Sequence, residues 1–186
     1  NIIYNDDVYG ARLVTEHLLS LGHTRIAYVG IRQGGLPNSD RLAGFRAEMH
    51  SARIMVDEKY IYLTSTRNPI GGREAAEYLL SLDQIPTAIV CYNDMIALGV
   101  YNCLQEKGLR IPQDISVTGY DDIPIVEYLS PPLTTLHQFK DELGVGAARM
   151  MLEVLVNQQG KEEKRSPSKK VSLKGILKIR ASTSSI

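Results

Sequence analysis

The chain has 186 residues, of which 44% are hydrophobic, enough for one substantial domain with a buried core. Its 21 lysines and arginines balance its 21 aspartates and glutamates, so the formal net charge is zero. Domains that bind nucleic acid with their own surface usually carry a basic excess, because neutralising phosphates supplies much of the affinity. The charge balance therefore argues against DNA contact by this segment itself.

The two cysteines and the lengths of the apolar runs exclude further classes. Cys91 and Cys103 lie in apolar periodic stretches, without the spacing of a disulfide framework or a zinc site. We interpret both as buried free thiols in a reducing compartment. The longest apolar run is far shorter than a membrane span, so we expect no membrane partner. No signal peptide is visible, although the abrupt opening on a strand-like segment (residues 1–4) is compatible with loss of an N-terminal part.

The first two thirds of the chain alternate between strand-like and helix-like hydrophobic spacing. Val14, His17, Leu18 and Leu21 recur at helical spacing, and Gly22 follows as an expected left-handed cap. Strands are predicted over 25–30, 60–65, 87–93 and 115–120. Between them, we expect a turn-rich loop over 31–40, a helix starting at Arg41, and helices over 71–82 and 96–108. This alternation predicts an α/β fold with a doubly wound, mostly parallel sheet and right-handed crossovers.

The last third of the chain has a different pattern. A double proline at 131–132 precedes a strand or crossover over 133–138, and a longer amphipathic helix is predicted over 139–156. The charged run 160–170 mixes acids with bases, which favours a solvated loop over a nucleic-acid patch. Residues 171–182 predict one or two short strands.

Polar residues follow several of the predicted strands, and ligands of open parallel sheets bind beyond the carboxyl ends of the strands. These residues are Asn93 with Asp94, Asp121 with Asp122, Arg41 and Gln138. Carboxylates accept hydrogen bonds from neighbouring hydroxyls, a guanidinium donates in a fork, and an amide does both. Together they predict a site for a small polar or polyhydroxylated ligand.

Each residue also has a purely structural interpretation. Asp94 is a good helix N-cap, which we favour over ligand contact, and Asp122 is suited to capping the following turn. Asn93 either contacts ligand or satisfies backbone groups at the strand end. Arg41 at a helix start would be poorly placed for the helix dipole, which favours a ligand role. The binding hypothesis depends on the convergence of these residues.

No catalytic or metal-binding pattern is found, and we predict that the chain is not an enzyme and has no metal or cofactor. The four histidines (His17, His23, His50 and His137) lack metal-ligand spacing and a nucleophile partner, and His17 lies on an apolar helix face. Asp121 and Asp122 are adjacent on a strand and so point to opposite faces. The glycines in 30–35 match neither a dinucleotide nor a phosphate-loop fingerprint.

Six motifs occur in order along the chain: LGHTRIAYVG (21–30), RLAGF (41–45), TAIVCYNDMIALGV (87–100), IPQDISVTGYDD (111–122), PPLTT (131–135) and LKIRAST (177–183). With them the chain resembles the lactose- and galactose-repressor family of transcription regulators over essentially its whole length. Periplasmic sugar-binding proteins share the ND-containing and GYDD-like strands. The combination of IPQDISV, PPLTT and IRAST favours the repressor branch.

The resemblance implies a periplasmic-binding-protein-like effector module, in which three crossing strands join two similar subdomains and ligand lies between them. Residues 5–138 and 171–186 would form the C-terminal effector-binding subdomain. Residues 1–4 and 139–170 would supply segments of the N-terminal subdomain and the crossovers. The DNA-binding headpiece would be absent from this chain, so operator DNA is an expected partner only through that missing part.

The family's effector contacts match four residues of this chain: Arg41 of RLAGF, Asn93 of CYND, Asp121 of GYDD, and Gln138 near the hinge. Many relatives place an aromatic ring that stacks on the ligand near the position of Arg67 in this chain. An arginine there either faces solvent or favours a phosphorylated or acidic effector. The resemblance thus implies a small polar effector, such as a sugar or sugar phosphate.

Lys140 also stands where some relatives have an aromatic residue, which argues against a familiar unmodified sugar. The family dimerises through its C-terminal subdomain, where the matching positions include Leu98, Ile123, Val126 and Leu129. The apolar residues of 123–129 either form a homodimer interface or pack into the core. We expect a cytoplasmic allosteric sensor that controls DNA binding. The alternative is a periplasmic-type solute-binding protein for sugar uptake or chemotaxis.

Overall fold

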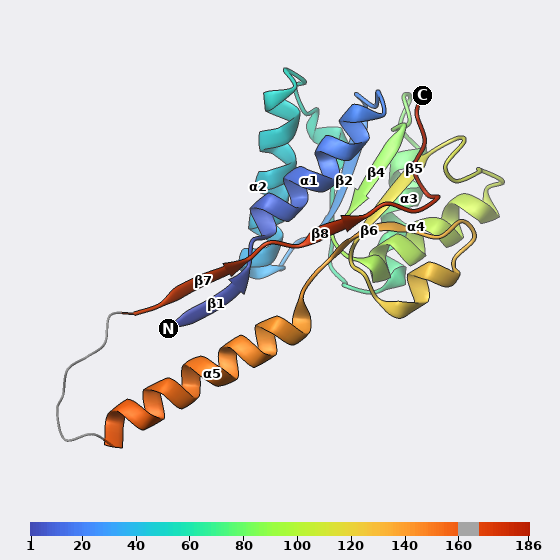
Figure 1. Cartoon of the computed structure of the whole chain (residues 1–186). Coiled ribbons are helices and arrows are strands. Elements are labelled where there is room, and N and C mark those ends of the chain that lie inside the picture. Colours follow the sequence, from blue (N-terminus) through green and yellow to red (C-terminus); the bar gives the residue numbers. More distant parts are fainter. Residues whose placement is uncertain (160–167) are drawn as a thin grey trace.

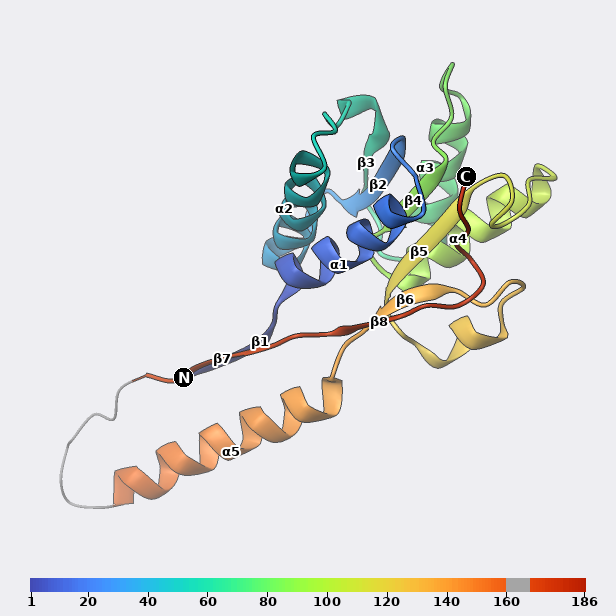
Figure 2. The same cartoon turned by 45° about the horizontal axis from the view of Figure 1, so that its top comes forward.

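A computed structural model describes residues 1–159 and 168–186 of the chain. The body of the molecule is a six-stranded sheet with helices on both faces (Figures 1 and 2). Its elements are α1 (Asp7–Ser20), β2 (Ile26–Ile31), α2 (Gly35–Ser51), η1 (Glu58–Tyr60), β3 (Ile61–Thr64), α3 (Pro69–Leu80), β4 (Ala88–Cys91), α4 (Asp94–Glu106), β5 (Ser116–Asp121), η2 (Pro124–Tyr128), β6 (Thr134–His137) and β8 (Ile176–Lys178).

The strand order is β3-β2-β4-β5-β6-β8, with every neighbouring pair parallel except β6 and β8, which are antiparallel. The chain adds β3 on one side of β2, then returns to add β4, β5 and β6 on the other side, and helices lie on both faces of the sheet. This confirms the predicted doubly wound, mostly parallel α/β sheet. The strands begin and end within one to two residues of the predicted limits, because buried apolar runs define them well.

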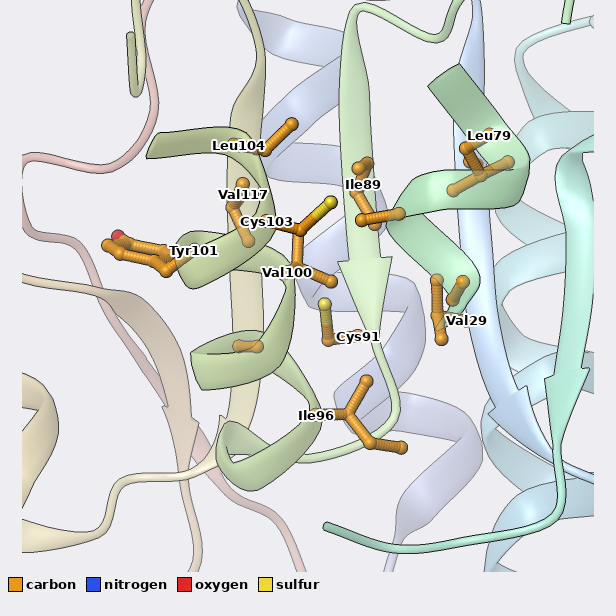
Figure 3. Packing of buried hydrophobic residues seen from close by; sticks show 14 of the residues in the cluster. Val29, Leu79, Ile89, Cys91, Ile96, Val100, Tyr101, Cys103, Leu104 and Val117 are labelled. Atoms are coloured by element: carbon orange, nitrogen blue, oxygen red, sulfur yellow. The ribbon is translucent and has the colours of Figure 1, made fainter. Parts of the chain in front are cut away.

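Two hydrophobic clusters cover the two faces of the sheet. Helices α1 and α2 pack together on one face, where Leu18 and Phe45 are fully buried. Helices α3 and α4 cover the other face, and Figure 3 shows Leu79, Val100 and neighbouring side chains against the strands. The closely packed faces make this sheet a rigid support for side chains at its edge.

Both cysteines lie in the second of these clusters. Cys91 on β4 and Cys103 on α4 are buried and unpaired, which confirms their interpretation as free thiols. At the amino end of the sheet, Gly22 follows α1 with a φ of +93°, as expected for a left-handed cap. Helix α3 begins at Pro69, two residues before the predicted start, with Asn68 as its N-cap.

The predicted loop over 31–40 is largely wrong, because α2 already begins at Gly35. Pro37 does not interrupt this helix, since N–H groups in a first helical turn have no intrahelical partner. The side chain of Asn38 accepts a hydrogen bond from the Ile31 N–H and ties the new helix to the end of β2 (2.8 Å). Arg41 therefore lies inside α2 and not at its start.

A smaller region stands apart from the sheet (Figure 1). It consists of the parallel pair β1 (Ile2–Asn5) and β7 (Lys170–Leu173) and the long helix α5 (Lys140–Gln159). Helix α5 contacts β1, where Gly146 approaches the side chain of Ile3 so closely that an added Cβ would lie 2.4 Å from it. Residues 160–167 of the charged run that we predicted as a loop lie outside the described residues. Among the described helices, none is both long and apolar enough to cross a membrane.

Candidate functional site

A buried arginine forms the floor of the candidate site at the carboxyl ends of the strands. The Arg41 Nε donates to Asp7 Oδ1 (2.8 Å) and Nη1 donates to the Tyr92 carbonyl (2.6 Å). Its guanidinium lies 3.6 Å from the ring centroid of Tyr120 and 4.5 Å from that of Tyr92. Burial disfavours the charged form, but the negative charge of Asp7 keeps the pKa of Arg41 above its usual value. The guanidinium is therefore fixed in position and permanently charged.

Asp121, the last residue of β5, faces this arginine. Its Oδ1 lies 3.9 Å from Arg41 Nη2, longer than a hydrogen bond, and it accepts a hydrogen bond from Gln138 Nε2 (2.7 Å). The backbone at Asp121 has a φ of +112°, a conformation that residues with side chains seldom adopt. Burial raises the pKa of the Asp121 carboxyl, and the charges of Arg41 and Lys140 partly offset this effect.

The site continues into the connections between the sheet and the smaller region. Gln138 follows β6 on the path to α5, and its Oε1 accepts a hydrogen bond from Asn5 Nδ2 at the end of β1 (2.6 Å). Lys140, at the start of α5, donates from Nζ to the Asp121 carbonyl (2.9 Å). A continuous chain of hydrogen bonds thus joins Asn5, Gln138 and Asp121 where three connections leave the sheet together (Figure 1).

The N-cap of α4 is Asn93 and not Asp94, which we favoured from sequence. Asn93 is the N-cap of α4, because its Oδ1 accepts from the Ile96 N–H (2.9 Å), while its Nδ2 donates to the Arg67 carbonyl (3.4 Å). Asp94 is fully buried and lies beneath the site. Asn93 remains partly exposed at the rim, so the cap does not exclude a contact with ligand.

The remaining predicted residues lie at the rim or face away. Arg67 follows β3 with its side chain exposed. Asp122 points away from Asp121 as predicted, but it does not cap a turn: it accepts hydrogen bonds from Arg180 Nη2 (2.8 Å) and lies 2.9 Å from His137 Nδ1. Burial acts in the opposite direction, yet these contacts hold the pKa of Asp122 below its usual value.

The sequence analysis missed Asn5, Asp7, Tyr92 and Tyr120. Asn5 and Asp7 stand at the end of the first strand, where the rule applied to the other strands would have found them. The two tyrosines carried no such signal, because strand-end tyrosines usually belong to the core. The site therefore contains two carboxylates, one guanidinium and three carboxamides, a set suited to a ligand with several hydrogen-bonding groups.

Within residues 1–159 and 168–186, no group of three His, Cys, Asp or Glu side chains is arranged to hold a metal ion. His17, predicted on an apolar face, is half-buried, with Nε2 2.9 Å from Thr183 Oγ1. Two surface hollows lie away from the site, one between β1 and α5 and one along α1. They are lined mainly by apolar residues in the first case and by mixed charges in the second.

The predicted interface residues divide into two groups. Val126 is completely buried in the core of this chain and cannot contact a partner, so that prediction is wrong. Ile123 and Leu129 are partly buried and pack against the same core, and Leu98 is half-buried. Two further residues of the same segment, Ile125 and Tyr128, are 50% and 82% exposed.

Comparison with known proteins gives a consistent result over nearly the whole chain. Residues 15–183 match the family model of a periplasmic binding protein-like domain. A protein of Actinobacillus pleuropneumoniae named HTH-type transcriptional repressor PurR is 40% identical over 151 residues, which cover 81% of this chain and 45% of that protein. This chain spans about half the length of the curated relatives it matches.

Solved structures of regulators share the fold. A LacI-type transcriptional regulator from Bacillus cereus subsp. cytotoxis is 32% identical with a TM-score of 0.89, over 99% of this chain and 63% of that one. A LacI family transcriptional regulator from Enterococcus faecium with bound ribose is 33% identical with a TM-score of 0.87, over 99% of this chain and 66% of that one.

Proposed function

Because this chain belongs to the periplasmic-binding-protein-like effector domains of the LacI family, we propose that it senses a small polar molecule and thereby controls the DNA binding of a transcription regulator. The relatives and structures named above are regulators, which favours this function over solute uptake or chemotaxis. The same relationship supports a location in the cytoplasm and a role without catalysis. Operator DNA would bind to a headpiece outside this chain.

The observation that carries the proposal is the unclosed contact between Arg41 and Asp121. Their facing Nη2 and Oδ1 atoms lie 3.9 Å apart, while each group is held by other partners. A ligand hydroxyl beside these two atoms would accept from the guanidinium and donate to the carboxylate, whereas a ring N–H would donate to the carboxylate. Fixed groups of this kind bind without losing side-chain freedom, which favours affinity.

We assign four residues to direct contact with the effector: Arg41, Asp121 and Gln138 from the floor, and Asn93 from the rim. Arg67 lies at the outer edge, where it would meet only a ligand that extends beyond the floor, such as one carrying a phosphate. A sugar or sugar phosphate fits this arrangement. The ribose in the Enterococcus faecium regulator supports the sugar class.

The division of the chain into two regions suggests how binding would be transmitted. We propose that residues 5–138 and 171–186 form the C-terminal effector subdomain, and that residues 1–4 and 139–170 belong to the N-terminal subdomain and crossovers. Asn5 and Gln138 lie on connections between the regions, so a ligand that engages them would favour one relative orientation. Control of DNA binding requires the ligand to bind that orientation more tightly than others.

A homodimer is part of the proposal, with a revised surface. Val126 is excluded by its burial, whereas Ile123 and Leu129 flank the exposed Ile125 and Tyr128 along the chain, and the half-buried Leu98 on α4 remains a candidate. Large exposed apolar side chains close together are typical of an interaction surface. Sedimentation of the regulator with Tyr128→Ser should show a lower dimer fraction if this surface is correct.

Thermal-shift screening of the intact regulator against sugars, sugar phosphates and nucleobases tests the function. A true effector should raise the melting temperature of the wild type and not of Asp121→Ala, because ligand that binds only the folded state stabilises it. Asp114→Ala is the matched control, since Asp114 lies at the opposite end of β5 and pairs with Arg110. Equal shifts in both variants would remove Asp121 from the site, and no shift with any class would contradict the sensor proposal.

A further inference from the structure

A second buried carboxylate, Asp94, lies beneath the site and has no assigned role. It is the first residue of α4 and is fully buried. Its Oδ1 accepts a hydrogen bond from Thr135 Oγ1 of β6 (2.6 Å), and its Oδ2 accepts from the Ile123 N–H (2.9 Å). One side chain therefore connects α4, β6 and the segment that follows β5.

The sheet contains a space for this carboxylate. A Cβ added to Gly119 of β5 would lie 2.2 Å from Asp94 Oδ1 and 2.7 Å from the Leu133 side chain. Any other residue at 119 would displace the carboxylate or the strand. The close approach of Asp94 to β5 is thus built into the backbone, two residues before Asp121.

The segment held by Asp94 has an unusual conformation. Asp121 and Asp122 have φ values of +112° and +50°, and both come directly before Ile123, whose N–H binds Asp94. Consecutive non-glycine residues with positive φ persist only where surrounding contacts hold them. This conformation sends Asp121 toward Arg41 and Gln138 and sends Asp122 toward Arg180.

We propose that Asp94 is a positioning residue, which anchors the Ile123 N–H and so keeps the 121–122 turn in the conformation that aims Asp121 into the effector site. The inference rests on the proposed function, since Asp121 matters only if it binds effector. Asp94 makes no contact with Arg41 among the described interactions and acts through the turn. The same turn would then respond to the charge of Asp94.

The surroundings of Asp94 make that charge variable near neutral pH. The pKa of Asp94 is raised to about 7, because burial and the negative charges of Asp121 and Asp122 together outweigh the hydrogen bonds from Thr135 and Ile123, which lower it. Cys91 of β4 also faces it, but burial raises the pKa of that thiol far above neutrality, so it stays protonated. A charged Asp94 binds the Ile123 N–H more strongly than a neutral one. The turn should therefore be held more firmly above pH 7 than below it.

Amide NMR of the chain without ligand tests the inference. In the wild type, the Gln138 side-chain amide and the Asp122 and Ile123 N–H signals should shift with a midpoint near pH 7. Asp94→Asn should abolish this transition, and Thr135→Val should move its midpoint upward, because the Thr135 hydrogen bond favours the charged carboxylate. A residue that only stabilised the fold would change the melting temperature without moving the midpoint.

Hydrogen exchange gives an independent measurement. In Asp94→Ala the Ile123 N–H should exchange about tenfold faster or more, because it loses its acceptor. The Ile96 N–H, bound by Asn93 on the same helix, is the internal reference. A transition near pH 7 that survives in Asp94→Asn, a midpoint unmoved by Thr135→Val, or unchanged Ile123 exchange would overturn the inference. Since none of these readouts needs an effector, failure of the ligand screen leaves this test intact.

Discussion

The two ends of the six-stranded sheet both carry buried polar clusters, but only one has the character of a binding site. At the amino end, His23 is buried with Nδ1 3.0 Å from Thr87 Oγ1 and Nε2 3.1 Å from Ser116 Oγ and 3.0 Å from the Ser184 carbonyl. These partners are hydroxyl and backbone groups. The chain end from 182 to 186 lies over them, with Ser182 bonded to β5 and β6.

At the carboxyl end the cluster is built from full charges and unusual backbone. Arg41, Asp7 and Asp121 meet there, the facing atoms of Arg41 and Asp121 are 3.9 Å apart, and the backbone at Asp121 is left-handed. Buried polarity is thus common to both ends. What distinguishes the functional end is charge held at a distance that a small molecule can bridge, together with strain that packing alone does not require.

The largest effect is expected from removing the charge at the carboxyl end. Arg41→Met should lower the free energy of unfolding by about 3–5 kcal/mol, because it leaves the buried Asp7 carboxylate without its partner. Arg41→Lys, which keeps the charge but not the fork, should cost less. Chemical denaturation of each variant measures the difference.

The double variant Arg41→Met with Asp7→Asn sharpens this prediction. It should recover part of the lost stability, since the uncompensated charge is gone, while effector binding stays lost. Strictly additive costs of the two substitutions would mean that the pair is not coupled and would contradict the buried ion pair as the organiser of the floor.

At the amino end a smaller and purely structural effect is expected. Ser182 is fully buried, donates to the Val117 carbonyl (2.6 Å) and accepts from the Thr134 N–H (2.8 Å). Ser182→Ala should therefore cost about 1–3 kcal/mol through two unsatisfied backbone groups, with effector affinity unchanged. The matched control is the exposed Ser20→Ala, expected within about 0.5 kcal/mol of wild type. A loss of affinity in Ser182→Ala would mean that the two ends of the sheet are coupled.

The sequence alone predicted the sheet and part of the polar cluster at its carboxyl end. Buried apolar runs such as 115–120 located the strands, and the rule that ligands bind beyond strand ends brought Arg41, Asp121 and Gln138 together. The start of α2 was missed because glycines and a proline are typical of loops, yet they are tolerated in a first helical turn.

The choice of Asn93 over Asp94 as the N-cap of α4 could not be predicted from local pattern. Both residues are good N-caps, and the choice depends on Gly119 and Thr135, which are distant in sequence and provide the space and the donor for a buried carboxylate. Val126 was misassigned for a similar reason: a short 3-10 turn, η2, buries one of its apolar residues and exposes its neighbours. Tertiary contacts, and not propensity, decide such positions.

The smallest expected effect is the pH dependence of stability, and its sign should differ between the two ends of the sheet. Burial lowers the pKa of His23, partly offset by its bond to the Ser184 carbonyl, and burial together with the charge of His23 lowers that of His17. The unfolded chain then binds more protons than the folded one below the usual histidine value of 6.5, so stability is lost as the pH falls through that range. Asp94 acts oppositely: with a pKa raised from 3.8 to about 7, its contribution is complete below pH 3.8 and is lost as the pH rises through 7.

Melting temperatures of the wild type, His23→Gln and Asp94→Asn between about pH 4 and 8 separate the two contributions. His23→Gln should weaken the fall in stability below pH 6.5 and leave the range above it unchanged. Asp94→Asn should instead remove part of the loss of stability that accompanies a rise in pH from about 4 to about 7, because an amide carries no charge to desolvate. The two pH ranges overlap below 6.5, and the sign of the change separates them. If both variants changed the slope of the profile in the same direction, the amino and carboxyl ends of the sheet would not titrate independently, and charge would no longer distinguish the binding end from the closed one.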